Sequence, residues 1–142
     1  MYFVIAALTG ALADVERKHQ LLRSVANLVA ETARMAHIEV RVDCGKTEQV
    51  SADAEQIRQV LLNPALNAVQ AMPNRGEIVL RSRQEGETVI LEVIDQGIGI
   101  APENLERIFD PFFTTRAEGT GLGLSIAHQI VKAHGGKNHC EE

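Results

Sequence analysis

The sequence has few cysteines and no excess of basic residues, and both facts narrow its function. Cys44 and Cys140 are its only cysteines, and they lie far apart in a spacing that fits no redox motif or zinc site, which favours a reducing, cytoplasmic setting. The net charge of -5 argues against a broad basic face, so we expect no nucleic-acid partner. Any anionic ligand must therefore be held by local geometry.

The chain also lacks a long apolar run, an internal repeat and a linker rich in proline, glycine or serine. Its apolar opening, MYFVIAALTGALA, is too short to span a bilayer and has no basic flank, so it predicts neither a transmembrane helix nor a signal peptide. The 142 residues suffice for one domain with a real core. We expect this domain to be cytoplasmic and leave open whether a longer parent protein is anchored in a membrane.

Apolar spacing and turn residues predict an α+β sandwich with helices on one face of a mixed sheet. Asp53 is the expected N-cap of the second helix, with Gln56 three residues on, and Gly135-Gly136 is expected to end the last one. The expected elements are a helix over Val15–Ala36, a strand over Ile38–Asp43, a helix from about Ala54, a β-hairpin over Gly76–Asp95 turning at Glu85-Gly86, an irregular stretch over Gln96–Thr120 and a helix over Gly121–His134.

The second helix, which contains QVLLNPALNAVQAM, carries a stripe of uncharged amides. Its members recur every three or four residues: Gln56, Gln59, Asn63, Asn67 and Gln70. Because the rest of the helix is apolar, we expect this stripe to be shielded from bulk water. Buried amides need partners, and either a polar ligand with a hydrated magnesium ion or the neighbouring backbone would supply them.

Two glycine-containing motifs follow the hairpin. In DQGIGI, Asp95 stands at a strand end, where its carboxylate can accept a hydrogen bond from an exocyclic amine, and Gly97 and Gly99 let the backbone approach a flat ring. The alternative is a simple turn. In GTGLGLSI, glycines open a helix whose free N–H groups attract phosphate oxygens.

Aromatic residues are scarce, and three of the four phenylalanines lie just before the second glycine motif, in FDPFFTTR. Polar and glycine residues follow in TTRAEG, which is typical of a mobile lid. We expect Phe109, Phe112 and Phe113 to anchor this lid on the domain, the alternative being that they are core residues. Arg116 is the nearest cation for phosphate charge.

In order and spacing, these motifs resemble the catalytic and ATP-binding domain of sensor histidine kinases, of the GHKL superfamily and closest to the nitrogen-regulatory type. QVLLNPALNAVQAM resembles the N box, DQGIGI the first glycine box, FDPFFTTR the F box and GTGLGLSIAHQIVKAHGG the second glycine box. The resemblance implies a Bergerat-type two-layer sandwich over residues 19–142, preceded by an apolar segment and connector over residues 1–18.

The resemblance also implies roles for individual residues, with ATP as substrate and Mg²⁺ as cofactor. Asn67 would bind Mg²⁺, Asn63 would lie near the phosphates, and Asp95 would bind the adenine amine. Asn63, Asn67 and Arg116 would form the catalytic set. The full set of expected ATP-binding residues is Asn63, Asn67, Ala68, Asp95, Gly97, Gly99, Ile100, Phe112, Thr115, Arg116, Gly119, Thr120, Gly121, Leu122, Gly123 and Leu124.

The sequence departs from the family pattern in three places. Pro64 stands inside the N box, where it is expected either to bend the helix or to start a new one with Asn63 as its N-cap. No phosphoacceptor motif is present, and His19 lacks the acid and proline that would follow it. The chain ends in KNHCEE, so we expect the last two strands of the fold to be missing.

The apolar segment YFVIAAL (Tyr2–Leu8) has the composition of a buried strand. We expect it to cover the resulting gap in the sheet, either within its own chain or across a dimer.

The resemblance implies a kinase domain that presents the γ-phosphate of ATP to a histidine on a separate dimerisation domain, with a response regulator downstream. One alternative is an ATPase of the same superfamily, although such enzymes place a glutamate base where this chain has Asn63. A second alternative is a protein-interaction module that retains the fold without kinase activity.

Overall fold

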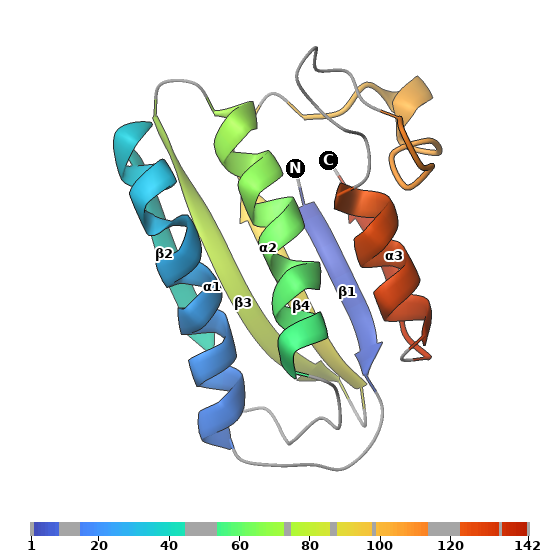
Figure 1. Ribbon diagram of the computed structural model, residues 1–142, viewed down its shortest axis with the longest axis horizontal. Helices are drawn as coiled ribbons and strands as arrows, with labels where there is room; N and C mark the ends of the chain where they lie inside the picture. Colours follow the sequence, from blue (N-terminus) through green and yellow to red (C-terminus); the bar gives the residue numbers. More distant parts are fainter. Residues whose placement is uncertain are drawn as a thin grey trace.

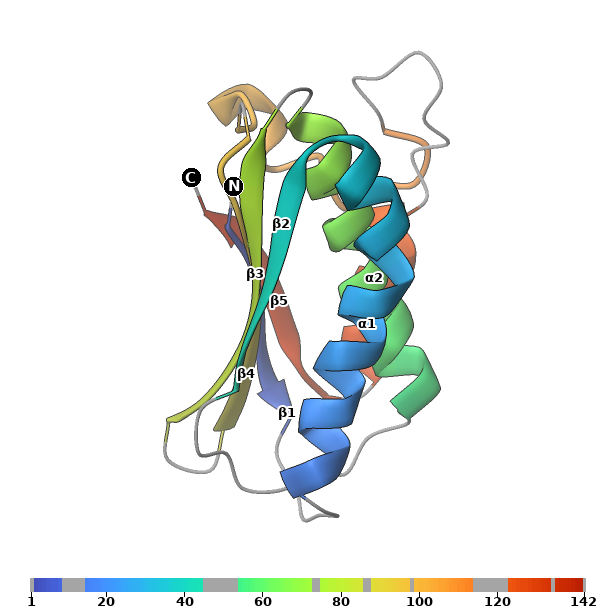
Figure 2. The same cartoon turned by 90° about the vertical axis from the view of Figure 1, so that its left-hand side faces the viewer.

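The computed structural model describes residues 2–8, 15–44, 54–72, 75–85, 88–97, 99–113, 123–133 and 135–141. These residues form a five-stranded mixed sheet in the order β2-β3-β4-β1-β5. Three helices lie side by side over one face of this sheet (Figure 1). The edge-on view shows these three α-helices on the same side of the sheet (Figure 2). The predicted α+β sandwich with helices on one face of a mixed sheet is therefore confirmed.

The elements follow one another along the chain much as the sequence predicts. Only β2 and β3 pair in parallel, and the other neighbouring strands are antiparallel. No helix among the described residues is both long and apolar enough to cross a membrane. In chain order the elements are β1 (Tyr2–Leu8), α1 (Val15–Met35), β2 (Ile38–Cys44), α2 (Ala54–Ala71), β3 (Gly76–Glu85), β4 (Thr88–Asp95), a short 3-10 turn (Pro102–Asn104), α3 (Gly123–Ala133) and β5 (Lys137–Glu141).

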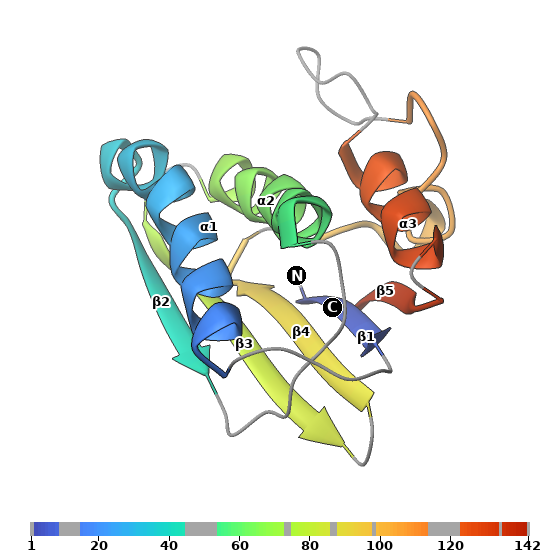
Figure 3. The same cartoon turned by 60° about the horizontal axis from the view of Figure 1, so that its bottom comes forward.

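The core lies between the sheet and the helices, and α2 is the most deeply buried of them. Val60, Leu61, Ala65 and Ala68 of α2 have no exposed surface, because α2 lies between α1 and α3 and over the sheet (Figure 3). Apolar side chains at three- and four-residue spacing on α1 and alternating side chains on the β3–β4 hairpin complete this core. They include Leu22, Val25, Val29, Ala33, Ile78, Leu80, Val89, Leu91 and Val93.

Pro64 lies inside α2, where it is buried. The helix continues from Ala54 to Ala71, so the expectation that a new helix starts at Pro64 is wrong. Proline costs one backbone hydrogen bond in the helix interior, and burial between neighbouring elements offsets that cost here. The expected bend of the helix remains a prediction, and the expected N-cap Asp53 lies outside the described residues.

The register of the β3–β4 hairpin aligns the buried side chains of its two strands. Leu80 pairs with Val93 and Ser82 with Leu91, and all four side chains are buried. On the opposite face of the sheet, Glu92 has no exposed surface and its Oε1 accepts a hydrogen bond from Arg83 Nε at 2.8 Å. This contact raises the pKa of the Arg83 guanidinium, so the buried carboxylate is matched by a permanent positive charge.

The two ends of the described chain meet inside the sheet. β1 lies between β4 and β5 and pairs antiparallel with both, with Phe3 opposite Val93 on one side and Cys140 on the other. The expectation that Tyr2–Leu8 fills a gap in the sheet is confirmed, within its own chain. The expectation that two strands are missing needs a correction, because residues 137–141 form β5.

Helices α1 and α3 are each followed by a residue with left-handed backbone geometry. Gly135, with φ of 71°, follows α3, and the N–H of Gly136 donates to the Val131 carbonyl at 2.9 Å. This is the glycine cap that the sequence predicts. His37 has φ of 58° after α1, a conformation that is strained for a residue with a Cβ.

We predict that His37→Gly raises the free energy of unfolding by about 0.5–1 kcal/mol, because relief of left-handed strain outweighs the added freedom of the unfolded chain. Urea denaturation measures the change. Met35→Gly is the control: it lies two residues earlier, exposed in the last turn of α1, and should lower the free energy of unfolding by about 0.5–1 kcal/mol. A decrease for both variants would contradict the strain assigned to His37.

Candidate functional site

The N box and the first glycine box meet where α2 and β4 end. A Cβ added to Gly97 would lie 2.9 Å from the Ala71 Cβ and 3.1 Å from the Ala71 carbonyl oxygen. Contacts under 3.0 Å are not tolerated without movement, so the backbone after β4 can approach α2 this closely only with glycine at this position. This junction fixes the distance between Asp95 and the last turns of α2.

Asp95 is a buried carboxylate at this junction, with 7% of its surface exposed. Its Oδ1 accepts a hydrogen bond from the Gly97 N–H at 2.8 Å, which holds the side chain in place, and its Oδ2 is also buried. A buried, oriented carboxylate is suited to accept a hydrogen bond from a ligand amine. Gly99, with φ of 79°, continues the glycine-dependent backbone that the sequence predicts for a flat ring.

The amide stripe of α2 is shielded from solvent only in part. Asn63 and Asn67 are half-buried, whereas Gln56, Gln59 and Gln70 are exposed. The expectation that the whole stripe is shielded is therefore wrong for its glutamines, because the ends of the stripe face outward from the helix layer. The two asparagines remain as the members suited to bind a ligand, and Asn67 lies one turn of α2 before Ala71.

Asn63 connects α2 to the start of α3. Its Nδ2 donates a hydrogen bond to the carbonyl oxygen of Gly123 at 2.9 Å, and a Cβ on Gly123 would lie 3.7 Å from the Asn63 Cβ. Gly123 is the first residue of α3 and the last glycine of the motif GTGLGLSI. The amide of Asn63 therefore fixes the end of that motif relative to Asn67, a role that spacing along the sequence does not reveal.

The three phenylalanines before the lid behave differently from one another. Phe109 packs against the core and stacks on His128 of α3, with ring centroids 5.3 Å apart. Phe113 lies under the Arg107 guanidinium, 4.6 Å from its ring centroid. Phe112 is 75% exposed, with φ of 66°, so the expectation that it anchors the lid is wrong. A left-handed backbone at this residue turns its side chain away from the core.

The donor set at the junction fits a magnesium ion that is held mostly by a ligand. No group of three or more His, Cys, Asp or Glu side chains in the described part of the chain could hold a metal. Mg²⁺ is commonly bound through one or two protein oxygens together with phosphates and water. The amide oxygen of Asn67 is a donor of this kind, so the residues present are compatible with a nucleotide-bound Mg²⁺.

Comparison with known proteins identifies the family. Residues 52–142 match the model of the histidine kinase-, DNA gyrase B- and HSP90-like ATPases. The chain belongs to this family. It is 44% identical to sensor histidine kinase ZraS of Salmonella typhi over 112 residues, which cover 78% of this chain and 24% of ZraS. The chain thus spans about a quarter of the length of this relative.

Solved structures agree with this assignment. The catalytic domain of histidine kinase ThkA superposes with a TM-score of 0.77 at 35% identity, covering 89% of this chain and 84% of that domain. Full-length ShkA gives a TM-score of 0.73 at 35% identity, covering 87% of this chain and 26% of ShkA. The match to the isolated ThkA domain covers most of both chains, so the described fold is that of a histidine kinase catalytic domain.

Several expected site residues of this domain lie outside the described residues. They are Thr115, Arg116, Gly119, Thr120, Gly121 and Leu122. Within the described part, Ala68 is fully buried, and Ile100, Gly123 and Leu124 are half-buried. The structure therefore brings Asn63 to Gly123 and Gly97 to the end of α2 beside Asp95, and the roles of the lid residues remain predictions.

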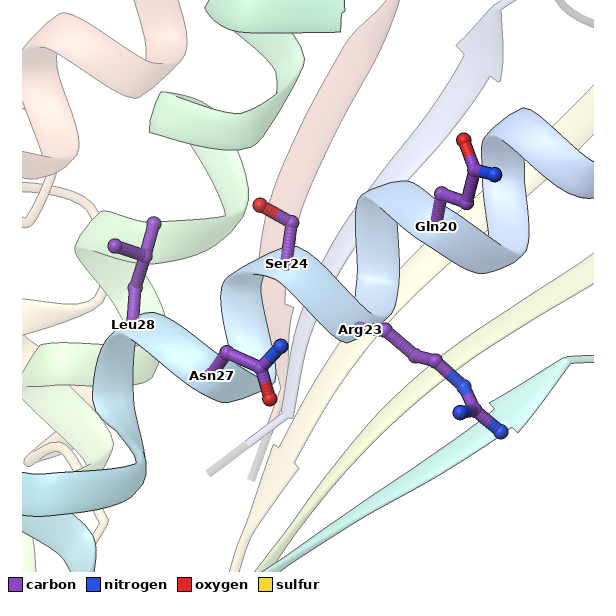
Figure 4. A pocket seen from close by; sticks show the side chains of 5 residues that line it. All are labelled: Gln20, Arg23, Ser24, Asn27 and Leu28. Carbon is purple, nitrogen blue, oxygen red and sulfur yellow. The ribbon is translucent and has the colours of Figure 1, made fainter.

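Two other features of the domain lie away from this junction. Burial raises the pKa of the Cys44 thiol, so this cysteine stays protonated and unreactive near neutral pH. A hollow of about 430 Å³ runs along α1, lined by Gln20, Arg23, Ser24, Asn27 and Leu28 (Figure 4). All five lining residues come from a single helix and from none of the motifs, so the hollow is separate from the candidate site.

The sequence motifs did not reveal three residues that shape the site. Ala71 sets the approach of Gly97, and its only signal in the sequence is a small residue at the end of the N box. His128 stacks on Phe109 and Arg107 lies over Phe113. His128 is inside the second glycine box but has no role assigned by that motif, and Arg107 lies outside the motifs. Side chains that position others have no periodic signature, so only the three-dimensional contacts identify them.

We predict that Asn63→Asp lowers the free energy of unfolding by about 1–3 kcal/mol, because the carboxylate cannot donate to the Gly123 carbonyl and repels it instead. Urea denaturation measures the effect. Gln59→Glu is the control, since it adds the same charge at an exposed position one turn earlier on the same stripe and should stay within about 0.5 kcal/mol of the parent chain. Equal stabilities of the two variants would show that the Asn63–Gly123 contact contributes nothing.

Proposed function

We propose that this chain is the ATP- and magnesium-binding catalytic domain of a two-component sensor histidine kinase. The observation that carries the proposal is the buried carboxylate of Asp95, oriented by the Gly97 N–H and fixed against the end of the helix that bears Asn67. In this proposal Asp95 accepts a hydrogen bond from the adenine amine. The backbone of Gly97 and Gly99 lies against the adenine ring.

The phosphate end of the nucleotide extends from Asp95 toward the start of α3. Asn67 supplies an amide oxygen to Mg²⁺, which neutralises phosphate charge when bound. The N-terminal N–H groups of α3 and of the preceding glycine motif face the phosphate oxygens. Asn63 holds these two parts together through the Gly123 carbonyl, and Arg116 adds positive charge from the lid.

The reaction we propose is transfer of the γ-phosphoryl group to a histidine on a separate dimerisation domain. The domain contributes positioning and charge neutralisation, which dominate catalysis of phosphoryl transfer. The ShkA structure contains the ATP analogue AMPPNP, and ThkA has been solved with its response regulator TrrA. By analogy, we propose a nucleotide and a response regulator as partners of the parent protein of this chain.

One observation weighs against the alternative of a fast ATPase. A hydrolytic enzyme needs a group that takes a proton from water, and at position 63 this chain has an amide whose Nδ2 already donates to Gly123. A side-chain amide does not accept a proton near neutral pH, so Asn63 cannot act as this base. We therefore propose that the isolated chain binds ATP without rapid turnover.

We predict that Asn67→Ala lowers the affinity for ATP in the presence of Mg²⁺ by at least about tenfold, because the amide is a metal ligand in this proposal. The part of the affinity that depends on Mg²⁺ should be lost. A fluorescence titration with ATP, with and without Mg²⁺, measures the effect, and a thermal melt checks that the variant folds. Gln70→Ala is the control, since Gln70 is exposed on the same stripe. ATP affinity in Mg²⁺ equal to that of the parent chain would refute the role of Asn67.

We predict that Asp95→Asn weakens ATP binding by about 1.5–3 kcal/mol, the value of one charge-assisted hydrogen bond. The substitution keeps one oxygen acceptor for the Gly97 N–H, so the fold should persist. It removes the charge and replaces the other carboxylate oxygen by an NH2 donor, which cannot accept from the adenine amine. Titrations with ATP and GTP measure the effect. Asp43→Asn serves as the control, because Asp43 pairs with Arg81 on the sheet, away from the junction. An equal loss of affinity for ATP and GTP would contradict the adenine contact.

A further inference from the structure

β1 separates the two parts of the sheet that carry the candidate nucleotide site. On one side, β4 ends at Asp95 and packs with β3 under α2. On the other side, β5 has β1 as its only neighbour in the described sheet, and it follows α3, whose first residue is Gly123. Figure 3 shows β1 between β4 and β5, with α3 above that side of the sheet.

The two parts are joined in two layers. In the helix layer, Asn63 of α2 donates its hydrogen bond to Gly123 of α3. In the sheet layer, the join is β1, which pairs with β4 from Tyr2 opposite Ile94 and with β5 from Tyr2 opposite Glu141. Neighbouring strands lie about 4.8 Å apart, so without β1 the strands β4 and β5 would be separated by about twice that distance, with unpaired backbone on both edges.

The start of β1 lies at the same end of the sheet as Asp95. Tyr2 is opposite Ile94, the residue before Asp95, and on its other side it pairs with Glu141, the last residue of β5. Any shift of β1 along or out of the sheet therefore changes the position of β5 and α3 relative to the Asp95–Gly97 junction.

β1 lies to one side of the three strands β2, β3 and β4. Buried apolar residues of these strands pack against those of α1 and α2. The three strands β2, β3 and β4 are neighbours in the sheet and are covered by α1 and α2. In the described sheet, β5 is joined to this three-stranded unit only through β1, and α3 is joined to it through α2 and β5.

We propose that β1 is a positioning element of the nucleotide site. When it is docked between β4 and β5, it holds α3 and the glycine motif against Asn67 and Asp95, and when it leaves this slot, nucleotide affinity falls. Bound nucleotide stabilises the docked strand by the same factor, because coupling between two equilibria is reciprocal. The inference rests on the proposed function, and it makes the N-terminal segment a control point for ATP binding.

The first test fixes β1 in its slot. Phe3→Cys in a Cys44→Ser background places a thiol opposite Cys140, at a spacing that a disulfide can span with small adjustments. On oxidation of the full chain we expect a cross-link within one chain, seen as a monomer on a non-reducing gel, and ATP affinity equal to or tighter than in the reduced form. No cross-link, or one between two chains, would overturn the proposal.

The second test releases β1 in the full chain. Val4→Pro removes a backbone N–H in the middle of a strand that is paired on both sides, and Thr9→Pro, just beyond the strand, is the matched control. We expect hydrogen exchange to rise in β5 and α3 while β2 and β3 stay protected. ATP affinity should fall by about 5- to 150-fold, the usual range of coupling between sites, and only in the strand variant.

The outcomes separate positioning from general stability. A combined variant carries Phe3→Cys and Val4→Pro in the Cys44→Ser background, and its thiols are oxidised to form the cross-link to Cys140. Recovery of ATP affinity in this variant would support positioning, since the cross-link returns the strand to its slot without restoring the missing N–H. Loss of protection across β2 and β3 as well would show that β1 belongs to one indivisible fold, and would overturn the proposal. So would unchanged ATP affinity in Val4→Pro when β5 and α3 have lost protection.

The same experiments distinguish this inference from the proposed function. If the parent chain binds no ATP with or without Mg²⁺, the proposed function is wrong. The positioning role of β1 is then judged by hydrogen exchange alone: it stands if Val4→Pro releases α3 and β5 together, and it fails if their protection is unchanged.

Discussion

The packing of α2 is the constraint on which the rest of the domain depends. Four of its residues have no exposed surface, and the helix touches α1, α3 and the sheet, so its position sets those of its neighbours. Its C-terminal end meets the glycine after β4 without room for a Cβ, and its middle is fastened to α3 through Asn63. A ligand between Asn67 and Asp95 therefore meets groups held by a rigid helix, which is the arrangement that preorganised binding requires.

Local patterns predict those parts of the fold that local forces determine. α1 and the β3–β4 hairpin alternate or repeat their apolar residues with the period of their secondary structure, so the sequence identifies both the elements and their inner faces. Gly135 is predictable for the same reason, because a helix that ends in a left-handed residue favours glycine. Asp95 and Gly97 are predictable only in combination with the other motifs, because a carboxylate followed by glycines at a strand end is also typical of a simple turn.

The sequence does not reveal features that depend on contacts between distant segments. KNHCE has weak strand propensity, and it becomes β5 because β1 offers it an edge to pair with. The register of β1 likewise depends on neighbours more than 80 positions away, Val93 and Cys140 among them. The predictions for Phe112 and for the exposed glutamines of α2 are wrong for a related reason. Residue type predicts only a preference for burial or for a hydrogen-bond partner. The neighbouring surface of the folded domain decides which residues are buried or paired.

The pairing of Tyr2 with Glu141 has a topological consequence. β5 and β1 are antiparallel neighbours whose free ends lie side by side, which is the geometry of a hairpin with its connecting turn left open. Circular permutation succeeds where chain ends lie close together at the surface. A short turn from Glu141 to Tyr2 would close the backbone into a ring, and new ends could be opened elsewhere without changing a strand pair. In such a permuted chain, the spatial order of the strands would stay the same while the order of the elements along the chain would differ.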